Sequence, residues 1–292
     1  LHRAVVGERS RTTLPAAWPT DLGGRRVAII WEQGLGDILF FLRYARLAHE
    51  RGAAVTVQVP GRLVAVLART SGFARVIADG APLDPADFTT YAGDLPFVLG
   101  ADRALPPLAL TPIEDRLREW RGRLAAFGPA PYLGLAWRAG TDFTTGQEFG
   151  RNIQSMSKAV DPQSLARAVR GWPGTLVSVQ REPRPGECDA FAKAAGQPLL
   201  DAAAANDDLD DVLALLGALD DYAGVSSTNV HLRAGLGLGG QVIVPYPPDW
   251  RWGGAGAVSP WFPGFTVHRQ EPGEPWPAVM QPLAAALSGG AV

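Results

Sequence analysis

Short apolar runs alternate with segments of helical periodicity along most of the chain. The run R-V-A-I-I-W is apolar after its first residue, and beyond it Leu39, Leu42, Ala45 and Ala48 recur near helical spacing. Apolar strands separated by helices are typical of a parallel sheet that is covered on both faces. The pattern therefore predicts a doubly wound α/β domain. Its strands and helices are expected at residues 26–31, 37–51, 54–59, 62–70 and 74–78.

The same alternation restarts after a less regular stretch at 79–112, which is rich in Pro and Leu. A helix is predicted at 114–127, and G-P-A-P at 128–131 is typical of a linker. We therefore expect a lead-in at 1–24 and two Rossmann-like domains, 25–128 and 129–292, facing a central cleft. Elements of the second domain are expected at 132–138, 162–170, 175–180, 208–219, 220–225, from 228 onward, 241–245, 265–269 and 277–288.

Composition narrows the function classes. The chain has 292 residues, 47% of them hydrophobic, and a formal net charge of -2. This charge balance gives no broad basic face for nucleic acid. No apolar run reaches the ~18 residues that a membrane span needs. The single cysteine, Cys188, fits a reducing compartment and is interpreted as a bystander. The start lacks an initiating Met and a signal-peptide core, so we expect a cytoplasmic piece of a longer polypeptide.

The first candidate for chemistry is W-E-Q-G-L-G-D, between the first strand and the first helix. Ligands bind at such turns in open α/β sheets. The residues of interest are Glu32, Gln33, Gly34, Gly36 and Asp37. A carboxylate here would repel a diphosphate, so Asp37 is better suited to accept a proton from an attacking hydroxyl. The alternative is that Asp37 is only a helix N-cap.

The second candidate is the segment G-V-S-S-T-N-V-H-L-R, where a strand ends and a helix begins. Free amides at a helix N-terminus, together with hydroxyl donors, can bind a diphosphate. The candidate donor-binding residues here are Ser226, Ser227, Thr228, Asn229 and His231. Arg233 is also close enough to the helix start to reach an anion. A plain cap and a packed histidine are the alternatives.

The third candidate is the polar, Gly- and Thr-rich loop that follows the strand at 132–138. A loop of about 20 residues in a compact domain is usually functional or mobile. Arg138, Thr141, Arg151 and Lys158 could each bind an anion or lie as solvated surface charges.

The fourth candidate is aromatic. P-P-D-W-R-W places Trp250 and Trp252 after a strand, and S-P-W-F adds Trp261 and Phe262. These rings could form a wall for a base or a sugar, or they could attach the Pro-rich loops to the sheet. The spacing of the histidines predicts no metal site, and no cofactor is expected.

Taken in order, W-E-Q-G-L-G-D, G-L-A-W-R-A-G-T, S-V-Q-R, G-V-S-S-T-N-V-H-L-R-A-G-L-G and P-P-D-W-R-W resemble the heptosyltransferase-like glycosyltransferases. The resemblance is strongest to the domain of this type that follows tetratricopeptide repeats in many bacterial proteins. It spans the chain from about Trp18 to the C-terminus. It implies a GT-B fold, metal-independent transfer from a nucleotide sugar, and a glycan, lipid or protein acceptor at the N-terminal lobe.

The resemblance also implies residue roles. Asp37 occupies the place of the catalytic base, and Lys158 matches a lysine that contacts the donor phosphates. The family's Asp-Thr-x-x-x-His stretch corresponds to Ser227, Thr228 and His231, with Ser in place of Asp and His one residue closer. This departure favours, as an alternative, a binding module that kept the fold and lost transfer. A nucleotide-sugar epimerase or hydrolase is a third hypothesis.

Overall fold

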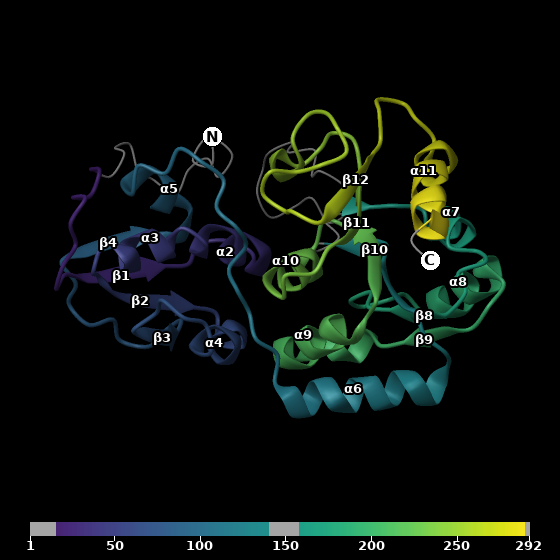
Figure 1. The fold of residues 1–292 in the computed structure, drawn as a ribbon, viewed down its shortest axis with the longest axis horizontal. Helices are drawn as coiled ribbons and strands as arrows, with labels where there is room; N and C mark the ends of the chain where they lie inside the picture. Colours follow the sequence, from purple (N-terminus) through teal and green to yellow (C-terminus); the bar gives the residue numbers. More distant parts are fainter. Residues whose placement is uncertain (1–15, 140–157, 290–292) are drawn as a thin grey trace. The chain divides into compact units, whose positions relative to one another are not determined.

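The computed structural model describes residues 16–139 and 158–289. Thr141 and Arg151, two of the predicted anion ligands, lie outside the described residues, as does most of the predicted lead-in. The chain divides into two compact units, Leu1–Thr111 and Pro112–Val292, each built on its own sheet (Figure 1).

The first unit contains a four-stranded parallel sheet in the order β3-β2-β1-β4. Val27, Ala28 and Ile29 of the central strand β1 are buried, as expected for a strand covered on both faces. The strands are β1 (Arg26–Ile30), β2 (Ala54–Val59), β3 (Arg75–Ala78) and β4 (Phe88–Tyr91). The helices are α2 (Leu35–Leu42), α3 (Ala45–Glu50), α4 (Gly61–Ala68) and α5 (Leu95–Val98), with the 3₁₀ turn η1 (Ala92–Asp94).

The helix predicted at 37–51 is two helices, α2 and α3, because the chain tightens at Arg43 and Tyr44. The Tyr44 backbone N–H donates to the carbonyl of Phe41, a 3₁₀-type bond. The Arg43 side chain is buried there, and it donates to the carbonyls of Phe40 and Leu105, at 2.9 Å each. Burial lowers the pKa of Arg43 to about 10. The turn thus places a cation inside the first unit, where backbone carbonyls solvate it.

The second unit contains a six-stranded parallel sheet in the order β12-β11-β10-β5-β8-β9. Its strands are β5 (Tyr132–Ala136), β8 (Thr175–Ser178), β9 (Leu199–Asp201), β10 (Asp221–Val225), β11 (Gly240–Val244) and β12 (Phe265–Arg269). Its helices are α6 (Glu114–Phe127), α7 (Pro162–Ala168), α8 (Glu187–Ala195), α9 (Leu209–Ala218), α10 (Thr228–Gly235) and α11 (Trp276–Gly289). Smaller elements are β6 (Arg138–Ala139), β7 (Lys158–Ala159), η2 (Ala203–Asp207) and η3 (Trp250–Trp252).

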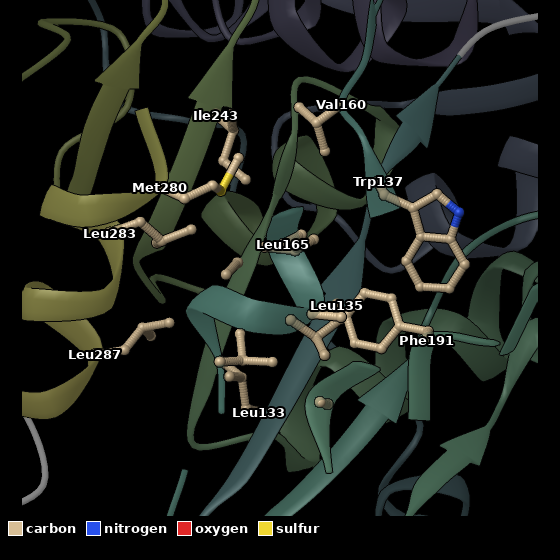
Figure 2. Close-up of a cluster of buried hydrophobic side chains, with 14 of the residues drawn as sticks. Leu133, Leu135, Trp137, Val160, Leu165, Phe191, Ile243, Met280, Leu283 and Leu287 are labelled. Carbon is tan, nitrogen blue, oxygen red and sulfur yellow. The ribbon is translucent and has the colours of Figure 1, made fainter. Parts of the chain in front are cut away.

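Helices cover both faces of this sheet. On one face, Leu133 and Leu135 of β5 pack with residues of α7, α8 and α11, as Figure 2 shows. Trp137 extends this core and stacks on Phe191 of α8, with ring centroids 5.0 Å apart. On the other face, Leu219 at the end of α9 lies against Gly134 of β5. The second unit is therefore doubly wound, as the alternation of strands and helices predicts.

Helix α6 belongs to the second unit, although the sequence places the boundary after it, at 128–131. Its buried side chains Leu117, Trp120 and Leu124 lie on the face that packs on α9. Trp120 Nε1 donates to Asp211 Oδ1 at 2.9 Å. Arg116 also pairs with Asp208 at 2.6 Å. The structural division falls before Pro112 because these contacts tie α6 to α9.

Arg233 of α10 is a buried cation that holds several chain turns together. Its side chain is 2% exposed. The guanidinium donates to the carbonyls of Gly239, Leu216, Leu219 and Asp220. Leu216 lies in the last turn of α9, where carbonyls have no partner within the helix, and the other three lie in the segments that follow α9 and α10. Arg233 is therefore structural in this unit, and the prediction that it could reach an anion is not supported by its contacts.

A buried histidine should make the second unit sensitive to mild acid. His268 of β12 is 6% exposed, its Nε2 lies 2.8 Å from Gln241 Oε1, and burial lowers its pKa. Below the unfolded pKa of about 6.5, the unfolded chain binds a proton that the folded chain excludes. We expect the free energy of unfolding to fall as the pH drops from about 6.5 towards the lower folded pKa.

The effect should be measurable by denaturant unfolding of the full chain between pH 7.5 and 5. His268→Gln keeps a hydrogen-bonding side chain without the titration, so it should flatten the pH profile. The exposed His49 offers a matched control, because His49→Gln should leave the profile unchanged. A His268→Gln profile identical to that of the parent chain would show that other groups cause the acid sensitivity.

Candidate functional site

Helix α10 begins directly after the carboxyl end of β10, and a helix start in this position can bind an anion. Ser226 is buried there, and Ser227 is the N-cap residue of α10 with an extended backbone. The Ser227 side chain makes no cap hydrogen bond, so it does not satisfy the first amides of the helix. The first amides of an α-helix have no partner within the helix and carry a partial positive charge. The expected alternative, a plain side-chain cap, does not describe this helix start.

Two of the predicted donor-binding residues on α10 are packed against neighbouring elements. Asn229 is 7% exposed, and its Nδ2 donates to the Val179 carbonyl at 3.2 Å and to Asn206 Oδ1 at 3.4 Å. His231 is also buried, with its ring edge-on to Phe262 at 5.1 Å. These contacts fix the helix start against the end of β8 and against the aromatic loop. Thr228, which is half-buried, lies in the first turn of α10.

Arg138, which follows β5, is held in a partly buried ion pair. Its guanidinium donates to the Glu187 carboxylate at 2.8 and 3.0 Å, and the two side chains are 14% and 12% exposed. Burial alone would raise the pKa of Glu187, but the hydrogen bonds from Arg138 and from the Arg184 backbone outweigh it and lower the pKa. Gln180 Oε1 also accepts from the Arg138 backbone N–H at 2.8 Å. In this arrangement Arg138 positions the turn after β5.

Lys158 belongs to a cluster of three charged side chains, with Asp249 and Arg251, at the carboxyl ends of the strands of the six-stranded sheet. Its Nζ lies 2.9 Å from Asp249 Oδ2, and Arg251 Nη1 lies 2.9 and 2.8 Å from the two Asp249 oxygens. Lys158 lies on β7, which pairs with β6 at the end of β5. Asp249 and Arg251 follow β11. Because β10 lies between β5 and β11, the ion pair connects segments on either side of β10.

The predicted aromatic wall divides into a buried ring and an exposed ring. Trp252 is 0% exposed and stacks on Phe262, with centroids 4.6 Å apart. It is therefore a core residue that attaches the loop to the sheet. Trp250 is 37% exposed, meets Trp261 edge-on, and has the Arg251 guanidinium 4.7 Å from its ring centre. Of the two, Trp250 is the ring that can contact a ligand.

The first unit carries the predicted base at the carboxyl end of β1. Gly34, not Asp37, is the N-cap residue of α2, and Asp37 lies in the first helical turn with Gly36. The Asp37 carboxylate leans back over the helix start, with Oδ2 3.5 Å from the position of a Cβ built on Gly34. The partial positive charge of a helix start favours a carboxylate. A small recess here is lined by Glu32, Gln33, Asp37, Ile38, Phe41, Ala92 and Gly93.

The described residues also bear on metal, membrane and thiol chemistry. Across 16–139 and 158–289, no group of three or more His, Cys, Asp or Glu side chains is arranged to hold a metal ion. In the same ranges, no helix is both long and apolar enough to cross a membrane. Burial raises the pKa of the Cys188 thiol to about 11, so the reactive thiolate is scarce at neutral pH.

Sequence reasoning missed Asp249 and Glu187, the acidic partners of Lys158 and Arg138. The signal for Asp249 was its place just after a buried strand, directly before W-R-W, where an Asp can cap a turn. The signal for Glu187 was weaker, because the helix that carries it follows a Pro- and Gly-rich turn and has no long apolar face.

Comparison with known proteins shows which fold this chain shares. No protein-family model matches the chain. The chain is 29% identical to Protein FlbA of Caulobacter vibrioides over 91% of its own length, and it spans about half (47%) of that relative. The structure is similar to the glycosyl transferase family 9 protein from Veillonella parvula, with a TM-score of 0.66 and 10% identity, covering 94% of this chain and 98% of that one.

It is also similar to the E. coli ADP-heptose LPS heptosyltransferase II. Here the TM-score is 0.59 and the identity 13%, and the match covers 91% of this chain and 100% of that one. At such identities the likeness concerns the fold alone. Both sheets are parallel, and both units alternate strands and helices in the predicted way. The expected fold class is confirmed: the chain has the α/β, GT-B architecture of the heptosyltransferases.

Proposed function

We propose that this chain is a glycosyltransferase whose second unit binds a nucleotide-sugar donor at the carboxyl end of β10. The observation that carries the proposal is the start of α10, where the Ser227 side chain makes no cap bond and Lys158 supplies a cation at the same sheet edge. Helix amides and a lysine together suit the diphosphate of a nucleotide sugar.

In the proposed reaction, an acceptor hydroxyl oxygen attacks the anomeric carbon of the donor sugar. The bond from that carbon to the diphosphate oxygen breaks, and negative charge collects on the departing diphosphate. The α10 amides and Lys158 stabilise this charge, which is the role that a metal ion has in other enzymes. Asp37 takes the hydroxyl proton as general base. Its half-buried carboxylate, at the end of β1, supports this assignment.

The E. coli neighbour is named for ADP-heptose, so an ADP-sugar is the first donor to test for this chain. The acceptor class, a glycan, a lipid or a protein, stays a prediction without a preferred member. The tether to tetratricopeptide repeats, the cytoplasmic location and the independence from metal also stay predictions.

A thermal-shift screen tests the donor site directly. The purified chain is heated with ADP-, UDP-, GDP-, CMP- and dTDP-sugars, once with EDTA and once with Mg²⁺. A ligand at 100 times its dissociation constant should stabilise the protein by about 2.7 kcal/mol, which raises the melting temperature visibly. We expect a shift with one nucleotide class and the same shift in EDTA.

Two results would change the proposal. A shift that requires Mg²⁺ would contradict metal-independent binding, because the α10 amides and Lys158 would then not suffice for the diphosphate. No shift with any nucleotide sugar would favour the alternative of a GT-B binding module that has lost its donor.

A further inference from the structure

The three charged side chains around Asp249 differ in their exposure to solvent. The three-charge cluster consists of Lys158, Asp249 and Arg251, and its formal net charge is one positive unit. Asp249 and Arg251 are buried, with side chains 5% and 7% exposed, whereas Lys158 is 32% exposed. The buried members are therefore fixed within the protein, and the ammonium of Lys158 is the member that solvent can reach.

Asp249 is fully occupied by donors from its own chain. Oδ1 accepts from the backbone N–H and from Nη1 of Arg251, at 3.1 and 2.9 Å. Oδ2 accepts from Arg251 Nη1 and from Lys158 Nζ, at 2.8 and 2.9 Å. A carboxylate with these partners is poorly placed to take a substrate proton. Its effect must act through the cations that it holds.

Among the residues that the structure describes, the Lys158 ammonium donates to Asp249 alone, so it has further donors to offer. A lysine ammonium has three N–H donors on a long, flexible stem. One of them reaches Asp249, and this contact holds the stem in one direction at the edge where β10 ends. β6, which pairs with the strand of Lys158, contacts β10 itself. The ammonium thus lies at the carboxyl ends of the central strands, the end of the sheet at which α10 begins, with donors left for an anion.

We propose that Asp249 is a positioning residue of the donor site: it holds the Lys158 ammonium in place for the diphosphate of the nucleotide sugar. This inference rests on the proposed function. This positioning strengthens donor binding. A free lysine side chain loses considerable rotamer freedom when it binds, whereas Asp249 already restrains Lys158 before the ligand arrives. Arg251 anchors the carboxylate from the buried side, so Asp249 itself does not move towards the ligand.

A purely electrostatic role for Asp249 makes the opposite prediction. A carboxylate near a diphosphate repels it, so removing the charge of Asp249 would tighten binding if repulsion were its only effect. Loss of positioning weakens binding even though the net charge of the cluster becomes more positive. The sign of the change in affinity therefore separates the two roles.

The experiment compares the full chain with Asp249→Asn, Lys158→Met and the double variant. The probes are ADP, UDP, GDP, CMP and dTDP, and inorganic pyrophosphate serves as a probe of the diphosphate alone; dissociation constants are measured by calorimetry. We expect Asp249→Asn to raise the Kd of the nucleotide that binds by about tenfold, equal to about 1.4 kcal/mol. In the Lys158→Met background, Asp249→Asn should have little further effect, because the two residues act as one unit.

Asp220→Asn is the matched control. It removes the same charge near the opposite end of β10, where Asp220 Oδ2 accepts from the Tyr132 backbone N–H, so affinity should not change. If Asp249→Asn does not fold, Asp249→Glu replaces it. This variant keeps the charge but moves the carboxylate by one methylene, so positioning predicts weaker binding and repulsion predicts the parent affinity.

The outcomes are distinct. Weaker binding by Asp249→Asn that vanishes in the Lys158→Met background supports the inference. Tighter or unchanged binding overturns it, and so does an equal loss in both backgrounds, while the donor site stands in each case. If the unaltered chain binds none of the nucleotides or pyrophosphate, the proposed function fails and the inference fails with it.

Discussion

Replacing Asp37 with asparagine should slow sugar transfer by about 10²- to 10⁴-fold, the usual contribution of a general base. Asparagine has nearly the same shape, so the first turn of α2 should be kept, but a carboxamide cannot take the proton of the acceptor hydroxyl. We propose the donor site in the second unit, so the affinity for nucleotide should stay within about twofold of the parent value. Release of nucleoside diphosphate, with acceptors prepared from bacterial extracts, measures the rate.

Glu32→Gln is the matched control, because Glu32 lines the same recess as Asp37 and carries the same charge. We expect it to lower the rate much less than Asp37→Asn does. Full activity of Asp37→Asn, with a large loss in Glu32→Gln, would move the role of base to Glu32. Full activity of both variants would remove the general base from this recess altogether.

Replacing Arg233 with methionine should destabilise the second unit by about 3 to 5 kcal/mol, since hydrogen bonds to charged groups contribute about 1.5–3 kcal/mol each. Methionine fills much of the same space but donates no hydrogen bonds. The carbonyls of Leu216, Leu219 and Gly239 would then lack the donor that they have now. Denaturant unfolding, followed by tryptophan fluorescence, gives the free energy of unfolding.

Arg233→Lys should show an intermediate loss, because one ammonium cannot reach all the carbonyls that the guanidinium fork reaches. The exposed Arg181 provides a control, since Arg181→Met should change stability by less than about 0.5 kcal/mol. A loss below about 1 kcal/mol in Arg233→Met would mean that water replaces the guanidinium, and the assignment of Arg233 as a structural cation would be wrong.

The sequence predicts the fold well wherever a strand is buried on both faces. The central strands β1, β5, β10 and β11 are mostly apolar, and their predicted positions agree with the structure to within a few residues. The edge strands β4 and β9 were missed. Their sequences, F-T-T-Y and L-L-D, are too short for a periodic signal, and few of their residues are buried. Their pairing depends on neighbouring strands that are distant in sequence.

The candidate site shows the same limit at the level of side chains. The strand end and helix start at Ser226 and Ser227 are local features, so the sequence reveals them. The pairing of Lys158 with Asp249 joins residues 91 positions apart, and a single sequence contains no signal for which charges meet. Trp250 and Trp252 are two residues apart, yet Trp250 is 37% exposed and Trp252 is 0% exposed. The 3₁₀ turn that contains both directs only Trp252 into the core.

The packing of α6 on α9 decides how the second half of this protein can be prepared alone. A fragment that begins at the Pro-rich linker 128–131 would keep every strand of the six-stranded sheet. It would nevertheless lose Trp120, and the surface of α9 that Trp120 and its neighbours cover would face water. Such a fragment invites aggregation for reasons unrelated to its ligand site. The natural starting point for preparing the second unit alone is therefore Pro112, ahead of the helix.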